Sequence, residues 1–193
     1  MVLFMGRLHR IKGLDVLVDA FATLRGSLRA AQLVIAGPDE GERAAVEVRA
    51  RRLGVSDAVH VVGRVDGDLR LAALRAADVF ALTSHSEGMP NAVLEACASG
   101  TPVLISDRCN LPEVSSFAAG RIVEVRAGAV AGALVEMLAD QPRLESMGEN
   151  GRRMVRERFA FSTVIDRLER MYEQLAGPGM SSAEPGAPAV QAA

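Results

Sequence analysis

Short apolar runs alternate with amphipathic segments along most of the chain. Continuous apolar stretches, typical of strands buried in a parallel sheet, occur at residues 2–5, 32–36, 59–62, 79–82, 103–105 and 122–123. Apolar positions with a period near 3.6 predict intervening helices over residues 14–24, 39–53, 66–77, 90–99 and 111–116. This alternation predicts an α/β fold: a single Rossmann-like domain with a parallel six-stranded sheet and helices on both faces.

The pattern becomes wholly helical after residue 123. Apolar positions at helical spacing mark three further C-terminal helices, around residues 130–138, 144–155 and 164–175. Residues 177–193 are rich in Gly, Pro and Ala and carry one charge, Glu184. Such a segment buries too little apolar surface to offset the entropy of ordering. We therefore expect a folded domain over residues 1–176 and a disordered tail over 177–193.

Polar residues cluster after the fourth predicted strand. Glu87 and Glu95 are separated by seven residues, and Glu95 follows Asn91 by one helical turn, about 6 Å along the axis. Carboxylates accept hydrogen bonds from vicinal sugar hydroxyls, and backbone N–H groups over 88–91 would open a helix that suits phosphate. Alternatively, Glu87 caps the turn and Glu95 is a solvated helix residue. A hydrolase would need opposed carboxylates, which this arrangement does not predict.

A second polar loop, G-R-L-H-R-I-K-G at residues 6–13, follows the first strand. Arg7 offers a bidentate fork and Lys12 a point charge, which together suit a diphosphate. A solvated basic loop is the alternative. The P-loop and dinucleotide-binding patterns are absent, so neither of those sites is indicated. His9 could line this loop, and His85 could be an acid, a base, a sugar ligand or a surface histidine.

Two polar patterns are typical of helix caps. Asp66-Gly67-Asp68 superficially matches a metal-binding pair, but a cap at Asp66 is the better interpretation, and we expect no metal. Asn110 and Glu113 fit a capping box around Pro112, with a ligand-facing Asn110 as the alternative.

Composition narrows the classes of function. The net charge of −2 and the 4% aromatic content argue against nucleic-acid binding. Cys97 and Cys109 are expected to be free thiols in a reducing compartment. The sequence has no signal segment and no apolar run of about 18 residues. We therefore expect a cytoplasmic protein.

Four segments together carry a family resemblance. They are F-M-G-R-L-H-R-I-K-G-L-D-V-L-V-D-A-F, L-V-I-A-G-P, V-H-V-V-G-R-V and A-D-V-F-A-L-T-S-H-S-E-G-M-P-N-A-V-L-E-A-C-A-S-G-T-P-V. In this order and spacing, the chain resembles the C-terminal, donor-binding domain of retaining family-four glycosyltransferases (glycosyl transferases group 1). These enzymes have the two-domain GT-B fold. The resemblance covers about residues 2–175.

The resemblance implies roles for individual residues. Arg7 and Lys12 would hold the donor diphosphate, Glu87 would approach the donor sugar, and Glu95 would bind the nucleotide ribose. With Arg7, Lys12 and Glu87 as catalytic residues, the other expected substrate-binding residues are Gly6, Arg64, Val65, Gly88, Met89, Pro90 and Asn91. The loop at residues 63–65 would meet the base largely through backbone.

The implied reaction moves a hexose from a nucleotide diphosphate sugar to an acceptor hydroxyl with retained configuration. The resemblance implies neither metal nor cofactor, because cations and a helix end stabilise the departing diphosphate. The apolar pattern begins at Val2 without lead-in residues, so we expect a piece of a larger chain or a reading frame that starts late. The resemblance implies that the missing piece is an N-terminal Rossmann-like domain and that this fragment alone is inactive. Any peripheral membrane association would come through that half. A non-catalytic nucleotide-sugar-binding or interaction module and a sugar-nucleotide epimerase half are the alternatives.

One departure from the family pattern bears on the sugar. Family members often carry a Gly-Gly pair where this chain has Cys109-Asn110. This difference leaves the identity of the donor sugar open.

Overall fold

A computed structural model describes residues 1–176, so the expected tail lies outside the described residues. Six strands form one parallel sheet in the order β3-β2-β1-β4-β5-β6. The expected six-stranded Rossmann-like sheet is therefore confirmed. The strands are β1 (Val2–Met5), β2 (Leu33–Ala36), β3 (Val59–Gly63), β4 (Val79–Leu82), β5 (Val103–Ser106) and β6 (Gly120–Val123).

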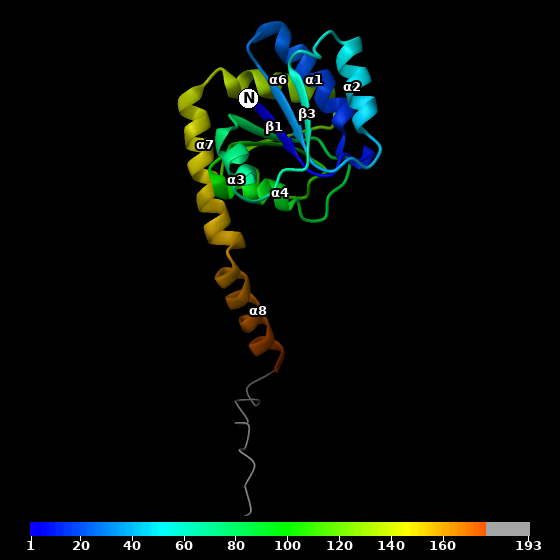
Figure 1. Cartoon of the computed structure of the whole chain (residues 1–193). Helices are drawn as coiled ribbons and strands as arrows, with labels where there is room; N and C mark the ends of the chain where they lie inside the picture. The colour runs from blue at the N-terminus through cyan, green and yellow to red at the C-terminus, as the bar shows by residue number, and fades with distance from the viewer. Residues whose placement is uncertain (177–193) are drawn as a thin grey trace, which may run out of the picture.

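Helices cover both faces of the sheet (Figure 1). One face carries α1 (Leu14–Ser27), α2 (Arg43–Arg52) and α6 (Ala127–Leu138), and the other carries α3 (Gly67–Ala76), α4 (Asn91–Ser99) and α7 (Gln141–Met154). The remaining helical segments are η1 (Arg10–Lys12), α5 (Glu113–Ser116), η2 (Val155–Phe159) and α8 (Phe161–Ala176).

The burial of each strand follows its place in the sheet. Every residue of β1, β4 and β5 is buried, because helices cover both faces of these central strands. The edge strand β3 instead alternates between half-buried and exposed residues. The chain order reverses between β1 and β4, which are neighbours in the sheet. In open α/β sheets this reversal point is where ligands bind, at the carboxyl ends of the strands.

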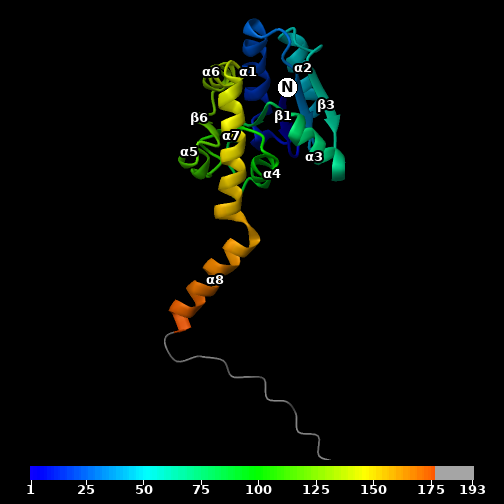
Figure 2. The ribbon, with the colours of Figure 1, turned by 90° about the vertical axis from the view of Figure 1, so that its left-hand side faces the viewer.

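The C-terminal helices pack on α4 and then leave the domain. A Cβ atom at Gly148 would lie 2.2 Å from the carbonyl oxygen of Gly100, so α7 can lie this close to the end of α4 only with glycine there. Beyond η2, helix α8 projects away from the domain (Figure 2). It exposes a row of apolar side chains: Phe161, Val164, Leu168, Met171, Tyr172 and Leu175.

The start predicted for α2 is wrong, and the side-chain cap predicted for α3 does not form, although α3 does begin after Asp66. Helix α2 begins at Arg43 rather than Asp39, because the Asp39 carboxylate accepts hydrogen bonds from the N–H groups of residues 41–43. These bonds also lower the pKa of Asp39. Asp66 occupies the N-cap position of α3, but its carboxylate binds the Arg64 guanidinium at 2.6 Å and caps no backbone N–H.

The expected capping box at α5 is also absent. Pro112 occupies the N-cap position, where its hydrocarbon ring cannot cap a backbone N–H, while Asn110 adopts a left-handed backbone conformation with φ of 49°. Asparagine tolerates this region better than most residues. The turn at Asn110 therefore brings the chain to α5 without using its side chain as a cap.

Cys97 and Cys109 are free thiols and both are buried, in line with the expectation of no disulfide. Burial raises the pKa of Cys97 to about 12 and also raises the pKa of Cys109. At pH 8 only about one in 10⁴ Cys97 side chains would be a thiolate, the reactive form.

We predict that neither cysteine reacts with a thiol reagent at pH 8 until the protein unfolds. The folded state keeps thiol protons that the unfolded chain releases above about pH 8.5. The free energy of unfolding should therefore fall as the pH rises from 8 to 10. Thiol titration with and without denaturant, together with urea unfolding at both pH values, checks this. Rapid labelling of the native protein would contradict it.

Candidate functional site

Two loops meet at the carboxyl ends of β1 and β4. The Thr83 hydroxyl donates to the carbonyl oxygen of Gly13 at 2.8 Å, and the His85 N–H donates to the carbonyl oxygen of Ile11 at 2.8 Å. Thr83 is buried. The loop after β1 and the loop after β4 are therefore fixed against each other, as their positions beside the reversal of strand order predict.

Lys12 and Glu87 form an ion pair where these loops meet. The Lys12 Nζ atom lies 2.7 Å from Oε1 of Glu87, and the two side chains are 15% and 11% exposed. The Ser84 hydroxyl donates to the same oxygen at 2.6 Å. Among residues 1–176, no side chain or backbone group donates to Oε2 of Glu87. One carboxylate oxygen is thus fixed by the protein, and the other remains available to a ligand hydroxyl.

The start of α4 presents backbone donors beside this pair. Helix α4 begins at Asn91, after Pro90. The N–H groups of Gly88 and Met89 have no acceptor within the described part of the chain. The partial positive charge of a helix N-terminus and such N–H groups together favour an anion.

Arg7 lies apart from Lys12 in this structure. Its guanidinium pairs with Glu40 at 2.9 Å, and the Arg7 side chain is 61% exposed. An exposed pair of this kind is worth only about 0–1 kcal/mol. Little free energy would therefore be lost if Arg7 exchanged Glu40 for a phosphate.

Glu95 is held by an arginine that sequence reasoning missed. Arg70 of α3 donates from Nε to Oε2 of Glu95 at 2.6 Å, and its Nη2 atom contacts the same oxygen. The position of Arg70 in the sequence does not distinguish it from other arginines, because α3 and α4 meet only in the tertiary structure. Oε1 of Glu95 accepts no hydrogen bond from residues 1–176.

A cavity of about 200 Å³ opens beside Arg70 at the carboxyl ends of β1 to β3. Arg64, at its edge, pairs with Asp66, and that hydrogen bond raises the pKa of Arg64. The residues that line the cavity are Met5, Gly6, Arg7, Gly37, Pro38, Arg64, Val65, Asp66 and Arg70. Four residues expected to bind substrate are therefore brought together here, and Gly37, Pro38 and Arg70 join them.

A larger cavity, of about 390 Å³, lies on the same pair of loops as the Lys12–Glu87 pair. His9, Arg10 and Ile11 line it from the first loop and η1, and His85 lines it from the loop after β4. It shares no lining residue with the cavity beside Arg70.

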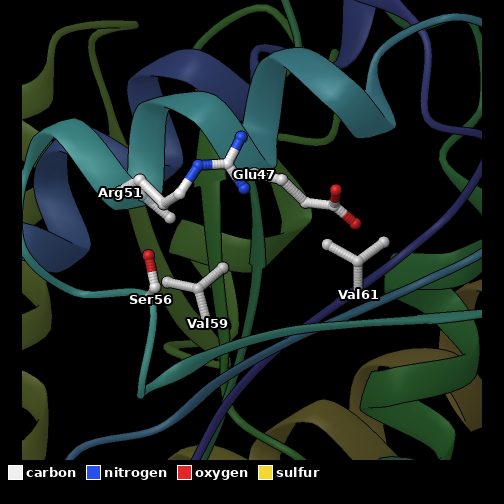
Figure 3. Close-up of a pocket in the computed structure, with 6 residues that line it drawn as sticks. Glu47, Arg51, Ser56, Val59 and Val61 are labelled. Atoms are coloured by element: carbon white, nitrogen blue, oxygen red, sulfur yellow. The ribbon is translucent and has the colours of Figure 1, made fainter.

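A further hollow lies between α2 and the edge strand β3 (Figure 3), and none of the expected site residues lines it. Glu47 and Arg51 of α2 lie over Val59 and Val61 of β3 there. In addition, residues 1–176 contain no group of three or more His, Cys, Asp or Glu side chains placed to hold a metal ion. Within the same residues, no helix is both long enough and apolar enough to cross a membrane.

The fold and the paired loops define a Rossmann-like domain with a candidate ligand site at the reversal of strand order. The family model described as "Glycosyl transferases group 1" matches residues 1–154, and the chain belongs to this family. The resemblance inferred from the four sequence segments is thereby confirmed.

The sequence of a named relative agrees with this assignment. The chain is 34% identical over 178 residues to a D-inositol 3-phosphate glycosyltransferase of Corynebacterium aurimucosum, covering 89% of this chain and 42% of the relative. The chain therefore spans less than half the length of that relative.

Solved structures show the same fold. The structure of sucrose-phosphate synthase from Thermosynechococcus elongatus matches 91% of this chain and 45% of its own, with 29% identity and a TM-score of 0.79. The C-terminal domain of a glycosyl transferase group 1 family protein from Francisella tularensis matches 83% of this chain and 86% of its own, with a TM-score of 0.75. At 19% identity, that second likeness concerns the fold alone.

Proposed function

We propose that this chain is the donor-binding half of a retaining glycosyltransferase that transfers a hexose from a nucleotide diphosphate sugar to an acceptor hydroxyl. The observation that supports this most directly is the Lys12–Glu87 pair at the meeting of the two loops. In this proposal Lys12 would be the cation for the leaving diphosphate, and the neighbouring Glu87 would offer a carboxylate oxygen to a sugar hydroxyl.

The nucleotide would occupy the cavity beside Arg70. The loop around Arg64 and Val65 would meet the base, and Glu95, oriented by Arg70, would accept bonds from the ribose. Arg7 would leave Glu40 to bind the diphosphate together with Lys12. The free N–H groups of Gly88 and Met89 would bind the phosphate or the sugar.

Catalysis in this proposal is electrostatic and needs no metal. Negative charge that develops on the departing diphosphate is stabilised by Lys12, Arg7 and the start of α4. Glu87 positions and stabilises the sugar instead of attacking it, and the leaving phosphate helps to deprotonate the acceptor. The acceptor would sit mostly in an N-terminal Rossmann-like domain, so the 193-residue chain should bind donor but not transfer sugar. We further propose that the protein is cytoplasmic, with any membrane association through that other domain.

We predict that UDP or GDP, or a sugar derivative of one of them, stabilises the chain against thermal unfolding. A ligand at 100 times its dissociation constant adds about 2.7 kcal/mol to the free energy of unfolding. Differential scanning fluorimetry with UDP, GDP, ADP and their hexose derivatives measures this. Arg7→Gln should weaken the binding, whereas Arg29→Gln, an exposed arginine before β2, should not.

The absence of any shift with these nucleotides would contradict donor binding by this half. Retention is tested separately on a form that includes the N-terminal domain. The anomeric proton coupling of the first-formed product, followed by NMR, should match that of the donor. An inverted product would contradict the retaining mechanism while leaving donor binding intact.

A further inference from the structure

The cavity lined by His9, Arg10, Ile11 and His85 has no role in the donor site as proposed above. It is an open hollow of about 390 Å³, and its four lining residues are all exposed. Three of its four lining side chains carry N–H donors, and none is a carboxylate. This composition favours an anionic ligand over a neutral or cationic one.

The basic side chains of the cavity have no acidic partner. Neither Arg10 nor His85 makes an ion pair or a side-chain hydrogen bond within residues 1–176, in contrast to Arg7 and Lys12. An exposed, unpaired guanidinium loses no protein contact when it binds an anion. It also offers the planar fork that matches a phosphate.

The histidine beside it is held in one tautomer. The Nδ1 atom of His9 accepts a hydrogen bond from the Ile11 N–H at 3.1 Å. A neutral ring with Nδ1 as the acceptor must carry its proton on Nε2, so His9 offers an Nε2–H donor. The His85 N–H donates to the carbonyl oxygen of Ile11, which fixes the backbone of the two loops at this cavity.

Residues that line this cavity are close in the chain to Lys12 and Glu87, which we propose bind the reacting end of the donor. Ile11 precedes Lys12, and His85 lies two residues before Glu87. The cavity beside Arg70, assigned above to the nucleotide, has a different set of lining residues. A ligand bound by Arg10 and the two histidines would therefore lie next to the donor sugar, where an acceptor must approach.

We propose that His9, Arg10 and His85 bind a phosphomonoester group of the acceptor. This inference rests on the proposed function only in identifying the ligand as the acceptor. The binding of the phosphomonoester itself does not depend on the donor site. The shared chemistry is a terminal phosphate with two ionisable oxygens, and it could belong to a soluble sugar phosphate or to a lipid headgroup. Arg10 would bind two of its oxygens, and His9 Nε2–H would bind one.

The test uses the three histidines of the chain as reporters. Imidazole resonances of His9, His60 and His85 are followed by NMR while glucose 6-phosphate is added to the 193-residue chain saturated with its best nucleoside diphosphate. We expect His9 and His85 to shift and His60, which lies in β3 and contacts Gln32, to remain unchanged. Glucose alone should move neither.

Matched variants separate binding at this cavity from a general effect of charge. Arg10→Gln should weaken glucose 6-phosphate binding by roughly tenfold or more, as expected for loss of a charge-assisted contact. Arg29→Gln removes the same charge from an exposed position before β2, at the opposite end of the strands, and should leave the affinity unchanged. Equal weakening by both variants, or by neither, would overturn the proposal.

Two further arms distinguish the sources and the competing interpretation. Vesicles of phosphatidylcholine with phosphatidic acid should bind the wild-type chain more than Arg10→Gln if the phosphomonoester belongs to a lipid. Binding of glucose 6-phosphate without such a difference supports the soluble source. If the nucleoside diphosphate instead displaces glucose 6-phosphate, the cavity is part of the donor diphosphate site and the proposal is wrong.

Failure of this inference is distinguishable from failure of the proposed function. If no nucleotide binds, the same titration is run on the free chain, and shifts of His9 and His85 still report the phosphomonoester. If nucleotides bind but glucose 6-phosphate and phosphatidic acid leave both histidines unchanged, donor binding stands and the acceptor inference falls.

Discussion

Lys12→Ala should remove most of the affinity of this chain for its nucleoside diphosphate. The substitution deletes the only cation that contacts Glu87 among residues 1–176, and so leaves a largely buried carboxylate next to the expected diphosphate position. Loss of a charge-assisted contact costs about 1–3 kcal/mol, and repulsion from the uncompensated Glu87 carboxylate adds to that cost. Isothermal calorimetry with the nucleotide found in the fluorimetry screen measures the change.

Glu87→Gln should not share the loss of nucleotide affinity that we expect for Lys12→Ala. The amide retains the shape of the side chain but no longer neutralises Lys12, so the nucleoside diphosphate should bind at least as tightly as in the wild type. The rate of sugar transfer by a protein that includes the N-terminal domain should nevertheless fall by roughly 10²-fold or more. This is the usual cost of losing a group that stabilises the transition state. Equal loss of nucleotide affinity in both variants would show that the pair only holds the loops together.

Gly13→Ala should both destabilise the domain and separate the two loops. Gly13 has φ of 62°, and a Cβ atom there would lie 2.2 Å from the carbonyl oxygen of Thr83. Backbone atoms cannot move aside as a flexible side chain can, so the loop after β1 must shift away from the loop after β4. We expect a loss of about 2–4 kcal/mol in the free energy of unfolding, because conformational strain adds to the steric clash.

The matched control is Gly26→Ala in the same chain. Gly26 lies in α1, and a Cβ atom there has no neighbour within 4 Å. Alanine in a helix is favoured over glycine by about 0.5–1 kcal/mol, so this variant should be slightly more stable than the wild type. Urea unfolding measures both variants. If Gly13→Ala were as stable as Gly26→Ala, the contact between the loops would not have the rigidity that we assign to it.

Much of the fold could be predicted from the sequence. The continuous apolar runs identified the strands, because the central strands of a parallel sheet are covered on both faces and need apolar side chains throughout. Boundaries were less predictable. Asp39 looked like the start of a helix, but its carboxylate binds the N–H groups of residues 41–43 and α2 begins only at Arg43. Asp66 does precede α3, but its carboxylate binds Arg64 and caps no backbone N–H. Both side chains have several neighbouring donors, and local sequence does not decide among them.

For the site, the sequence by itself determined which residue types follow which strands. It placed Lys12 and Glu87 after the first and fourth apolar runs. It could not show that their side chains pair, because 75 positions separate them and their contact depends on β1 and β4 being neighbours in the sheet. The partner of Arg7 was equally hidden, since Glu40 reaches it only from the loop after β2.

The tertiary structure alone decided the role of Arg70 and the grouping of His9, Arg10 and His85. A single arginine in a helix has no distinguishing pattern, and Arg70 reaches Glu95 only because α3 packs beside α4. Isolated histidines in two loops were equally ambiguous. The order of the strands brought those loops together, because the carboxyl ends of adjacent parallel strands lie at one edge of the sheet.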